Sequence, residues 1–132
     1  PGATLVRADA ALDVAAAKDA AGLLLDGPDR PTALVCDDDV MAAGAYKAAR
    51  ARGLEIPRDL SVTGFDDMPL ATALEPELST VRLPAAELGA AGMDALLRLL
   101  EGERPGPVSL PGELVVRGST GPAPAEWAAV VG

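Results

Sequence analysis

Histidine is absent from this sequence of 132 residues, and cysteine occurs once, as Cys36. Without His, Ser-His-Asp triads are excluded and most zinc sites lose a common ligand. A single Cys excludes an internal disulfide framework and is typical of a protein from a reducing compartment. Because Cys36 lies within an apolar run, we interpret it as a small buried side chain rather than a nucleophile.

Aromatic residues, basic residues and long apolar runs are also scarce. Aromatic residues make up 2% of the chain, too few to form a stacking platform for nucleic-acid bases. The net charge of −9 repels nucleic acid and anionic membrane surfaces. Any contact with DNA would therefore have to come from a part of the protein outside this sequence. No apolar run approaches the ~18 residues of a membrane span, and no leader-like segment opens the chain. The first residue is Pro1 rather than Met, from which we expect a longer protein.

Short apolar runs alternate with segments rich in Ala and Leu, and 49% of the residues are hydrophobic. Residues 32–36 (TALVC) and 60–65 (LSVTGF) are short enough to be strands buried on both faces. Between them, residues 39–52 predict a helix with acids at its start and basic residues near its end, as the helix dipole favours. Strand, helix and strand in this spacing form a βαβ unit, so the predicted fold class is α/β.

Further elements are predicted on both sides of this unit. A strand over residues 3–6 and a helix over residues 10–25 precede it, and Gly27 and Pro28 end that helix. The segments that follow are a helical turn over 70–74, an extended segment over 79–83, a helix over 84–102, and strand pieces over 108–110 and 113–117.

Both apolar strands end in carboxylates: residues 37–39 follow the first strand, and residues 66–67 follow the second. Ligands of open α/β sheets bind beyond the carboxyl ends of the strands, which points to these acids. Ionised carboxylates accept hydrogen bonds through both oxygens, so they suit ligands rich in hydroxyl or amine donors, such as sugars and nucleosides.

Two other interpretations of these acids remain open. Asp38 or Asp39 can cap the helix that follows, and Asp66 and Asp67 can shape a turn. The second of these interpretations is a magnesium-dependent phosphotransfer site, since hard cations take oxygen ligands. Such sites usually have a Lys or Thr partner at a third strand end, where this sequence has STVRL with Arg82.

Four segments, in this order and spacing, resemble one known family: TALVCDDDVMAAGA, GLEIPRDLSVTGFDD, PELSTVRLPAAELGAAGMDALLRLLEG and LPGELVVRGST. They are similar to the effector-binding core of LacI/GalR-type transcriptional regulators over residues 31–121, and residues 4–27 fit more weakly. The resemblance implies part of a type I periplasmic-binding-protein-like fold, with a Rossmann-like parallel sheet. It assigns residues 1–83 to most of the C-terminal lobe, 84–107 to a helix crossing to the N-terminal lobe, 108–120 to returning strands and 121–132 to a flexible tail.

The function implied by the resemblance is effector sensing in a cytoplasmic, homodimeric DNA-binding regulator, a repressor rather than an enzyme. A sugar or nucleoside-like effector would bind between two lobes, without a cofactor. DNA would be contacted only by a helix-turn-helix headpiece that is absent from this chain, and no membrane partner is expected. The alternative is a secreted type I periplasmic solute-binding protein for sugars. IPRDLSV before GFDD, and the closing LVVRGST, resemble the regulators more.

The resemblance also assigns ligand-binding residues. Asp66 matches the first acid of the family's G-F/Y-D-D motif, which contacts the effector, and Phe65 should point to the opposite face. Asp38 replaces the usual Asn of an A-N-D motif, with Asp39 beside it, which favours a donor-rich or cationic ligand. Leu83 matches a pocket-edge position that is often polar, so its aliphatic side chain argues against a simple sugar.

Dimer contacts of the family map to the helix after the first acids and to the segment after the second. The residues concerned are Ala43, Tyr46, Lys47, Leu70, Ala71 and Leu74. Tyr46 lies among small residues and beside Lys47, which favours a subunit contact over a core position, whereas Ala43 fits the core nearly as well.

Overall fold

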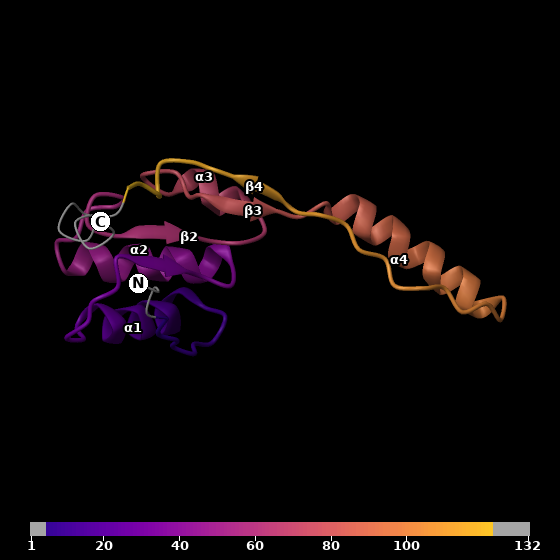
Figure 1. The fold of residues 1–132 in the computed structure, drawn as a ribbon, viewed down its shortest axis with the longest axis horizontal. Helices are drawn as coiled ribbons and strands as arrows, with labels where there is room; N and C mark the ends of the chain where they lie inside the picture. Colours follow the sequence, from indigo (N-terminus) through magenta and orange to yellow (C-terminus); the bar gives the residue numbers. More distant parts are fainter. Residues whose placement is uncertain (1–4, 123–132) are drawn as a thin grey trace, which may run out of the picture.

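The structure is a computed structural model that describes residues 5–122. Its elements are α1 (Val14–Leu25), β1 (Ala33–Val35), α2 (Asp39–Ala51), β2 (Ser61–Thr63), α3 (Pro69–Ala73), β3 (Thr80–Arg82), α4 (Ala85–Leu100) and β4 (Glu113–Val115), arranged as in Figure 1. Much of the predicted strand over residues 3–6 and of the predicted tail over 121–132 lies outside the described residues.

Helices α1 and α2 each begin directly after a capping aspartate, and α1 starts at Val14 rather than at the predicted residue 10. Asp13 accepts hydrogen bonds from the N–H groups of Ala15 and Ala16 at the start of α1, 2.8 and 2.9 Å away. Asp38 caps α2 in the same way, and Gly53, with φ of +69°, follows its last turn. Since an Asn or Asp side chain satisfies amides that the first helical turn leaves free, these caps account for the observed boundaries.

Helix α1 packs directly against α2 (Figure 1), and their backbones approach closely at Gly44. A Cβ atom at Gly44 would lie 2.6 Å from the Cβ of Ala17 and 2.7 Å from the backbone nitrogen of Lys18. Only glycine fits at such a crossing, so the small residues of these helices determine how near they lie.

The strands form one parallel βαβ unit that is extended by a second ladder. Strand β1 pairs in parallel with β2, and Leu34 lies opposite Val62. Parallel bridges from Thr63 to Ser79 and from Asp66 to Arg82 then join β2 to the β3 side, and β3 pairs antiparallel with β4. The α/β class and the βαβ unit predicted from the sequence are therefore confirmed.

The core lies between these strands and the helices, and alanine supplies much of it. Its members, all buried, include Leu25, Leu34, Ala42, Ala45, Ala48, Ala49, Leu60, Val62, Ala71 and Leu78. The prediction that β1 is buried on both faces is wrong: Leu34 is buried, but the neighbouring Val35 is 85% exposed. Side chains alternate between the faces of a strand, and within residues 5–122 the second face of β1 is left uncovered.

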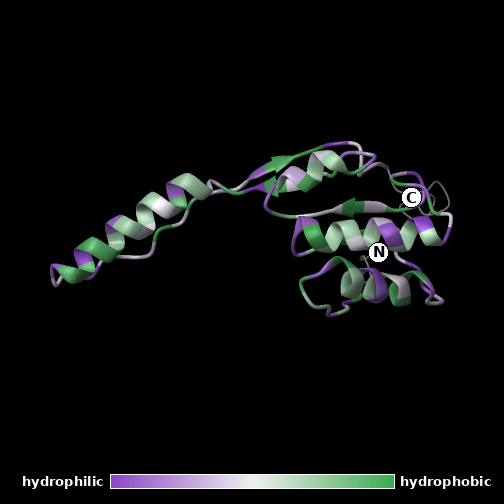
Figure 2. Cartoon of the chain, turned by 180° about the vertical axis from the view of Figure 1, so that it is seen from behind, coloured by the Kyte–Doolittle hydropathy of each residue, from purple (hydrophilic) through white to green (hydrophobic). Residues whose placement is uncertain are grey.

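Helix α4 extends away from the rest of the chain, and residues 103–112 run back along it (Figure 1). Nothing in the described part of the chain buries a residue of α4, although Figure 2 colours residues along its length as hydrophobic. The most exposed of these are Met93, Leu96, Leu97, Leu99 and Leu100. The predicted strand over residues 108–110 does not form, because that segment pairs with no other strand among the described residues. The helix lengths and compositions found between residues 5 and 122 include none suited to crossing a membrane.

Candidate functional site: carboxylates at the strand ends

The structure brings the two acidic segments to the same edge of the sheet. The N–H of Cys36 donates to the carbonyl of Thr63 at 2.9 Å, and the N–H of Asp39 donates to the carbonyl of Phe65 at 3.1 Å. The parallel pairing thus continues past the strands into residues 37–39, which we call the first acidic segment, and residues 66–67, which we call the acidic turn. Their proximity agrees with the expectation from parallel topology.

Asp39 is buried, and the structure does not place its side chain at an open surface. One carboxylate oxygen accepts a hydrogen bond from the Thr80 hydroxyl at 2.7 Å, and the other accepts one from the N–H of Met68 at 2.6 Å. Its assignment to ligand contact therefore conflicts with the geometry. A buried carboxylate with both oxygens bonded joins the start of α2 to β3 and to the segment after the acidic turn.

The glycine of the GFDD sequence is explained by the same carboxylate. A Cβ atom at Gly64 would overlap an oxygen of Asp39 and would lie 2.9 Å from a methyl group of Leu78. Gly64 is buried, and its N–H donates to the carbonyl of Ser79 at 3.0 Å. The packing around this position leaves no room for a side chain, so it requires glycine.

Asp38 occupies the capping position that was left open as an alternative. Its backbone is extended, and one carboxylate oxygen accepts a hydrogen bond from the N–H of Met41 at 2.6 Å. The side chain is buried to a large extent at the start of α2. Asp38 thus serves the helix, and a contact with a ligand stays a prediction.

Asp66 has the properties expected of a carboxylate available to a ligand. It is exposed, and its side chain has no hydrogen bond or ion pair with any of the described residues. Its N–H donates to the carbonyl of Val81 at 2.9 Å, and its φ is +102°, a conformation that few residues other than glycine adopt. Phe65 beside it is 37% exposed, so its ring is not buried in the core.

Asp67, to which sequence reasoning gave no more than a turn-forming role, is the best-bonded acid of the turn. The Nε of Arg82 and an Nη of Arg117 each donate to one of its oxygens, both at 2.7 Å. The hydrogen bond from Arg117, reinforced by Arg82, holds the pKa of the Asp67 carboxyl below its ordinary value. The arginines of STVRL and LVVRGST are visible in the sequence, but no local pattern indicates that they pair with Asp67, because Arg117 lies 50 positions away.

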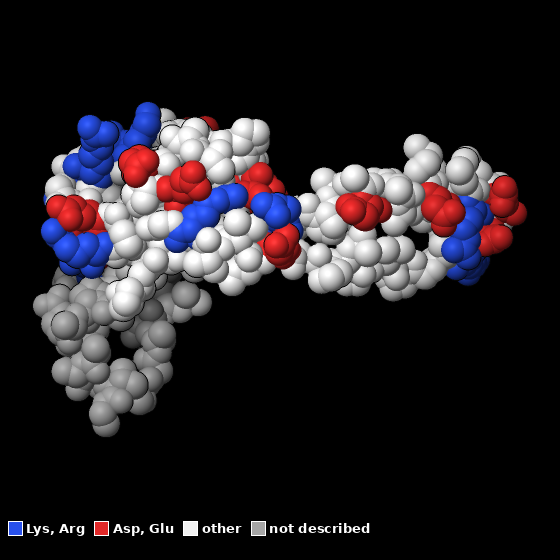
Figure 3. Space-filling model, turned by 90° about the horizontal axis from the view of Figure 1, so that it is seen from above, with Lys and Arg blue, Asp and Glu red and all other residues white. Residues whose placement is uncertain are grey.

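Charges of both signs surround this region. Figure 3 shows acidic and basic side chains interspersed over the described residues, and no continuous basic patch in that view.

Leu83 lies between β3 and α4 and is half-buried. Its carbonyl accepts a hydrogen bond from the N–H of Ala85 at 2.9 Å, where the chain turns into the helix. It lies two residues beyond Val81, which bonds the acidic turn. A place at the edge of a ligand pocket stays a prediction for this residue.

Three of the six predicted dimer residues are buried within this chain. Tyr46 is 9% exposed, its hydroxyl donates to the carbonyl of Pro76 at 2.8 Å, and burial raises its pKa to about 12. The preference for Tyr46 as a surface contact is therefore wrong, because the ring belongs to the core. Ala43 and Ala71 are buried too, whereas Lys47 is exposed and Leu70 and Leu74 are half-buried.

The site supports neither a reactive Cys36 thiol nor the hypothesis of a metal site. Burial, helped by the nearby charges of Asp38 and Asp37, raises the pKa of the Cys36 thiol to about 12, which keeps it protonated at neutral pH. Over residues 5–122 there is no group of three or more acidic or Cys side chains arranged to hold a metal ion.

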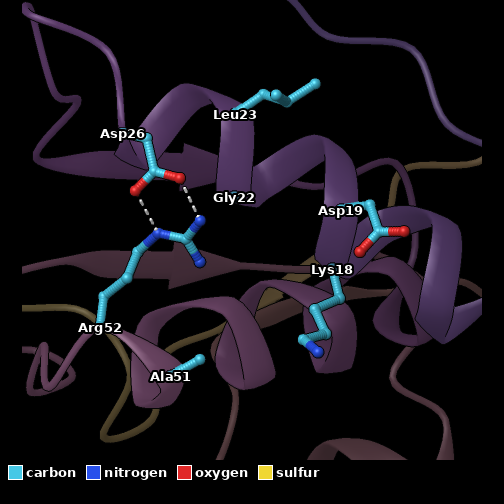
Figure 4. A pocket seen from close by; sticks show the side chains of 7 residues that line it. All are labelled: Lys18, Asp19, Gly22, Leu23, Asp26, Ala51 and Arg52. Atoms are coloured by element: carbon cyan, nitrogen blue, oxygen red, sulfur yellow. Dashed lines mark hydrogen bonds and ion pairs between the residues drawn. The ribbon is translucent and has the colours of Figure 1, made fainter.

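A pocket lies elsewhere, between α1 and the C-terminal end of α2, and none of the predicted ligand residues lines it. Its lining comprises Lys18, Asp19, Gly22, Leu23, Asp26, Ala51 and Arg52 (Figure 4). Arg52 donates through Nε to Asp26 at 2.8 Å and through an Nη to the carbonyl of Ala48 at 3.1 Å. The ion pair joins the C-terminal ends of the two helices, so we interpret the residues of this pocket as structural.

Comparison with known proteins supplies the family. Residues 3–120 match the model of the periplasmic binding protein-like domain. The chain is 50% identical over 99 residues to the HTH-type transcriptional regulator MalR of Streptomyces coelicolor, covering 72% of this chain and 28% of that protein. It is 43% identical over 99 residues to the HTH-type transcriptional repressor CytR of Escherichia coli, covering 74% of this chain and 29% of CytR.

A solved structure has a similar fold. The LacI family transcriptional regulator of Arthrobacter sp. FB24, in complex with lactose, aligns with a TM-score of 0.74 at 36% identity, over 85% of this chain and 43% of that one. The chain spans less than a third of the length of the curated relatives it matches. It belongs to the periplasmic-binding-protein-like domain family, as a partial effector-binding region whose relatives are LacI-family transcriptional regulators.

Proposed function

We propose that this chain is the C-terminal part of the effector-binding core of a cytoplasmic, homodimeric LacI-family repressor. The effector is a sugar or nucleoside-like molecule that binds between this lobe and a second one encoded upstream. The observation that carries the proposal is Asp66, an exposed carboxylate without a protein partner among residues 5–122, at the carboxyl ends of parallel strands. The lactose complex of the Arthrobacter regulator supports a sugar as the ligand class.

The mechanism follows from what a free carboxylate can do. The Asp66 oxygens accept hydrogen bonds from ligand hydroxyl or amine groups, while the second lobe supplies the remaining contacts. A ligand that bonds both lobes stabilises one lobe orientation over others. The dimer passes that orientation to helix-turn-helix headpieces, and Lys47, Leu70 and Leu74 are the predicted contacts with surface left to contribute.

The test compares two acids in the full-length protein, meaning this chain with its upstream sequence. Asp66→Ala is expected to abolish the effect of a panel of sugars and nucleosides on operator binding, with the thermal midpoint unchanged within a few degrees. Asp29→Ala, at an exposed acid between α1 and β1, is the matched control and should respond like wild type. A normal response of Asp66→Ala would remove Asp66 from the site.

The periplasmic solute-binding alternative is separated by the upstream sequence. A helix-turn-helix there supports the repressor, and a signal peptide supports the solute-binding protein. The names of the relatives, which are transcriptional regulators, favour the first.

A further inference from the structure

The Asp67 carboxylate is held by two arginines from different parts of the chain. Arg82 ends β3, and Arg117 follows β4, 50 positions after Asp67. The side chains of Asp67 and Arg117 are only 10% and 14% exposed, so this pair is shielded from water, unlike an ordinary surface ion pair. Arg82 is more exposed and donates a second hydrogen bond to Glu113 on β4 at 3.0 Å.

Arg117 is itself fixed by further hydrogen bonds. A second Nη donates to the carbonyl of Leu78 at 2.8 Å, and its backbone N–H donates to the Ser79 hydroxyl at 2.8 Å. Because a guanidinium group is planar and its donors point in fixed directions, these bonds determine where it can meet Asp67. Asp67 is consequently tied to both ends of β3.

The backbone of the acidic turn needs such support. Asp66 and Asp67 have φ of +102° and +55°, two consecutive residues in a region that side chains disfavour. Conformations of this kind persist only where surrounding contacts hold them. The N–H of Asp66 bonded to Val81, together with the two arginine pairs of Asp67, supplies those contacts.

We infer that Asp67 is a positioning residue, clamped by Arg82 and Arg117, that sets the direction of the neighbouring Asp66 carboxylate. The same clamp ties Asp66 to β3 and β4, the strands that lead into and out of α4. The arginines compensate the charge of Asp67, so Asp66 presents the uncompensated carboxylate of the turn. The statement that this orientation serves a ligand rests on the proposed function; the clamp itself does not.

Hydrogen exchange of the full-length protein without ligand tests the clamp. Arg82→Gln and the nearly isosteric Asp67→Asn are each expected to speed exchange of the Asp66 amide about tenfold more than exchange of the α1 and α2 amides, which respond only to the change in global stability. Arg58→Gln is the matched control, since it removes ion pairs to Glu55 and Asp59 outside the turn, and Asp66 exchange should stay at the wild-type rate. Unchanged Asp66 exchange in both variants, or equal acceleration throughout the chain, would overturn the inference.

Calorimetry with a sugar or nucleoside that binds the wild type tests the role of the clamp in binding. Arg82→Gln should weaken binding about tenfold, and Arg82→Lys, which keeps the charge, should recover part of the loss. Wild-type affinity in Arg82→Gln would overturn the positioning role. If no compound of the panel binds the wild type, the proposed function fails, while the exchange result still decides whether the clamp positions Asp66.

Discussion

The two acidic segments look alike in the sequence, yet they do different work in the fold. In the first, α2 begins at Asp39, so the helix turns Asp38 into a cap and Asp39 into the interior. In the acidic turn, α3 begins only at Pro69, and the backbone adopts two positive φ angles. Asp66 is thereby left exposed beside the strand ends. The segment that follows a strand therefore decides whether its terminal carboxylates are structural or available.

The largest effect is expected at the buried acid of the first segment. Asp39→Ala leaves the Thr80 hydroxyl and the Met68 amide without their acceptor, each worth about 1–3 kcal/mol when buried and unsatisfied. We expect the free energy of unfolding to fall by roughly 3 kcal/mol, measured by urea denaturation of the full-length protein. Asp37→Ala, at the exposed acid of the same segment, should change it by less than about 0.5 kcal/mol. Equal effects at the two positions would contradict the division into structural and exposed acids.

Local features of this fold could be predicted from the sequence, whereas long-range partners could not. The cap at Asp38 and the end of α2 before Gly53 depend on neighbours within a few residues, so spacing is enough to predict them, whereas the cap at Asp13 was missed and α1 begins later than the predicted residue 10. The bonding of Asp39 depends on Thr80, 41 positions away, and that of Asp67 on Arg117, 50 positions away. No local pattern reports such pairings.

Tyr46 and β1 show two other reasons for incorrect predictions. The small residues around Tyr46 in the sequence predict a surface position, yet its hydroxyl donates to the carbonyl of Pro76, 30 positions away. Strand β1 is apolar throughout, but the described residues cover only the face that carries Leu34. Apolar composition indicates which residues can be buried, and the neighbouring elements determine which of them are.

The pH dependence of stability offers an intermediate effect, specific to the acidic turn. The pKa of the Asp67 carboxyl is lower in the folded protein than its ordinary value of 3.8, chiefly because of Arg117. The ionised form is the one stabilised, so the contribution is complete above about pH 4 and is lost as pH falls through the lowered folded pKa. Asp67→Asn should therefore cost roughly 1.5 kcal/mol at pH 7 and less as the pH falls below about 4, measured by urea denaturation across that range. A difference that stays constant down to pH 3 would mean that ionisation of Asp67 contributes nothing.

The smallest effect is expected to have opposite signs in the two segments. Asp66 has a φ of +102°, which glycine adopts without strain, so Asp66→Gly should raise the free energy of unfolding by about 0.5 kcal/mol or more. Asp38 has extended backbone and caps α2, so Asp38→Gly should lower it slightly, by a few tenths of a kcal/mol. Thermal unfolding of both variants measures the difference. If Asp66→Gly also abolishes the response to ligand, then a residue that destabilises the fold is retained for binding, as expected of a strained functional site. Destabilisation by Asp66→Gly would instead show that its carboxylate supports the fold, and the contrast with Asp38 would disappear.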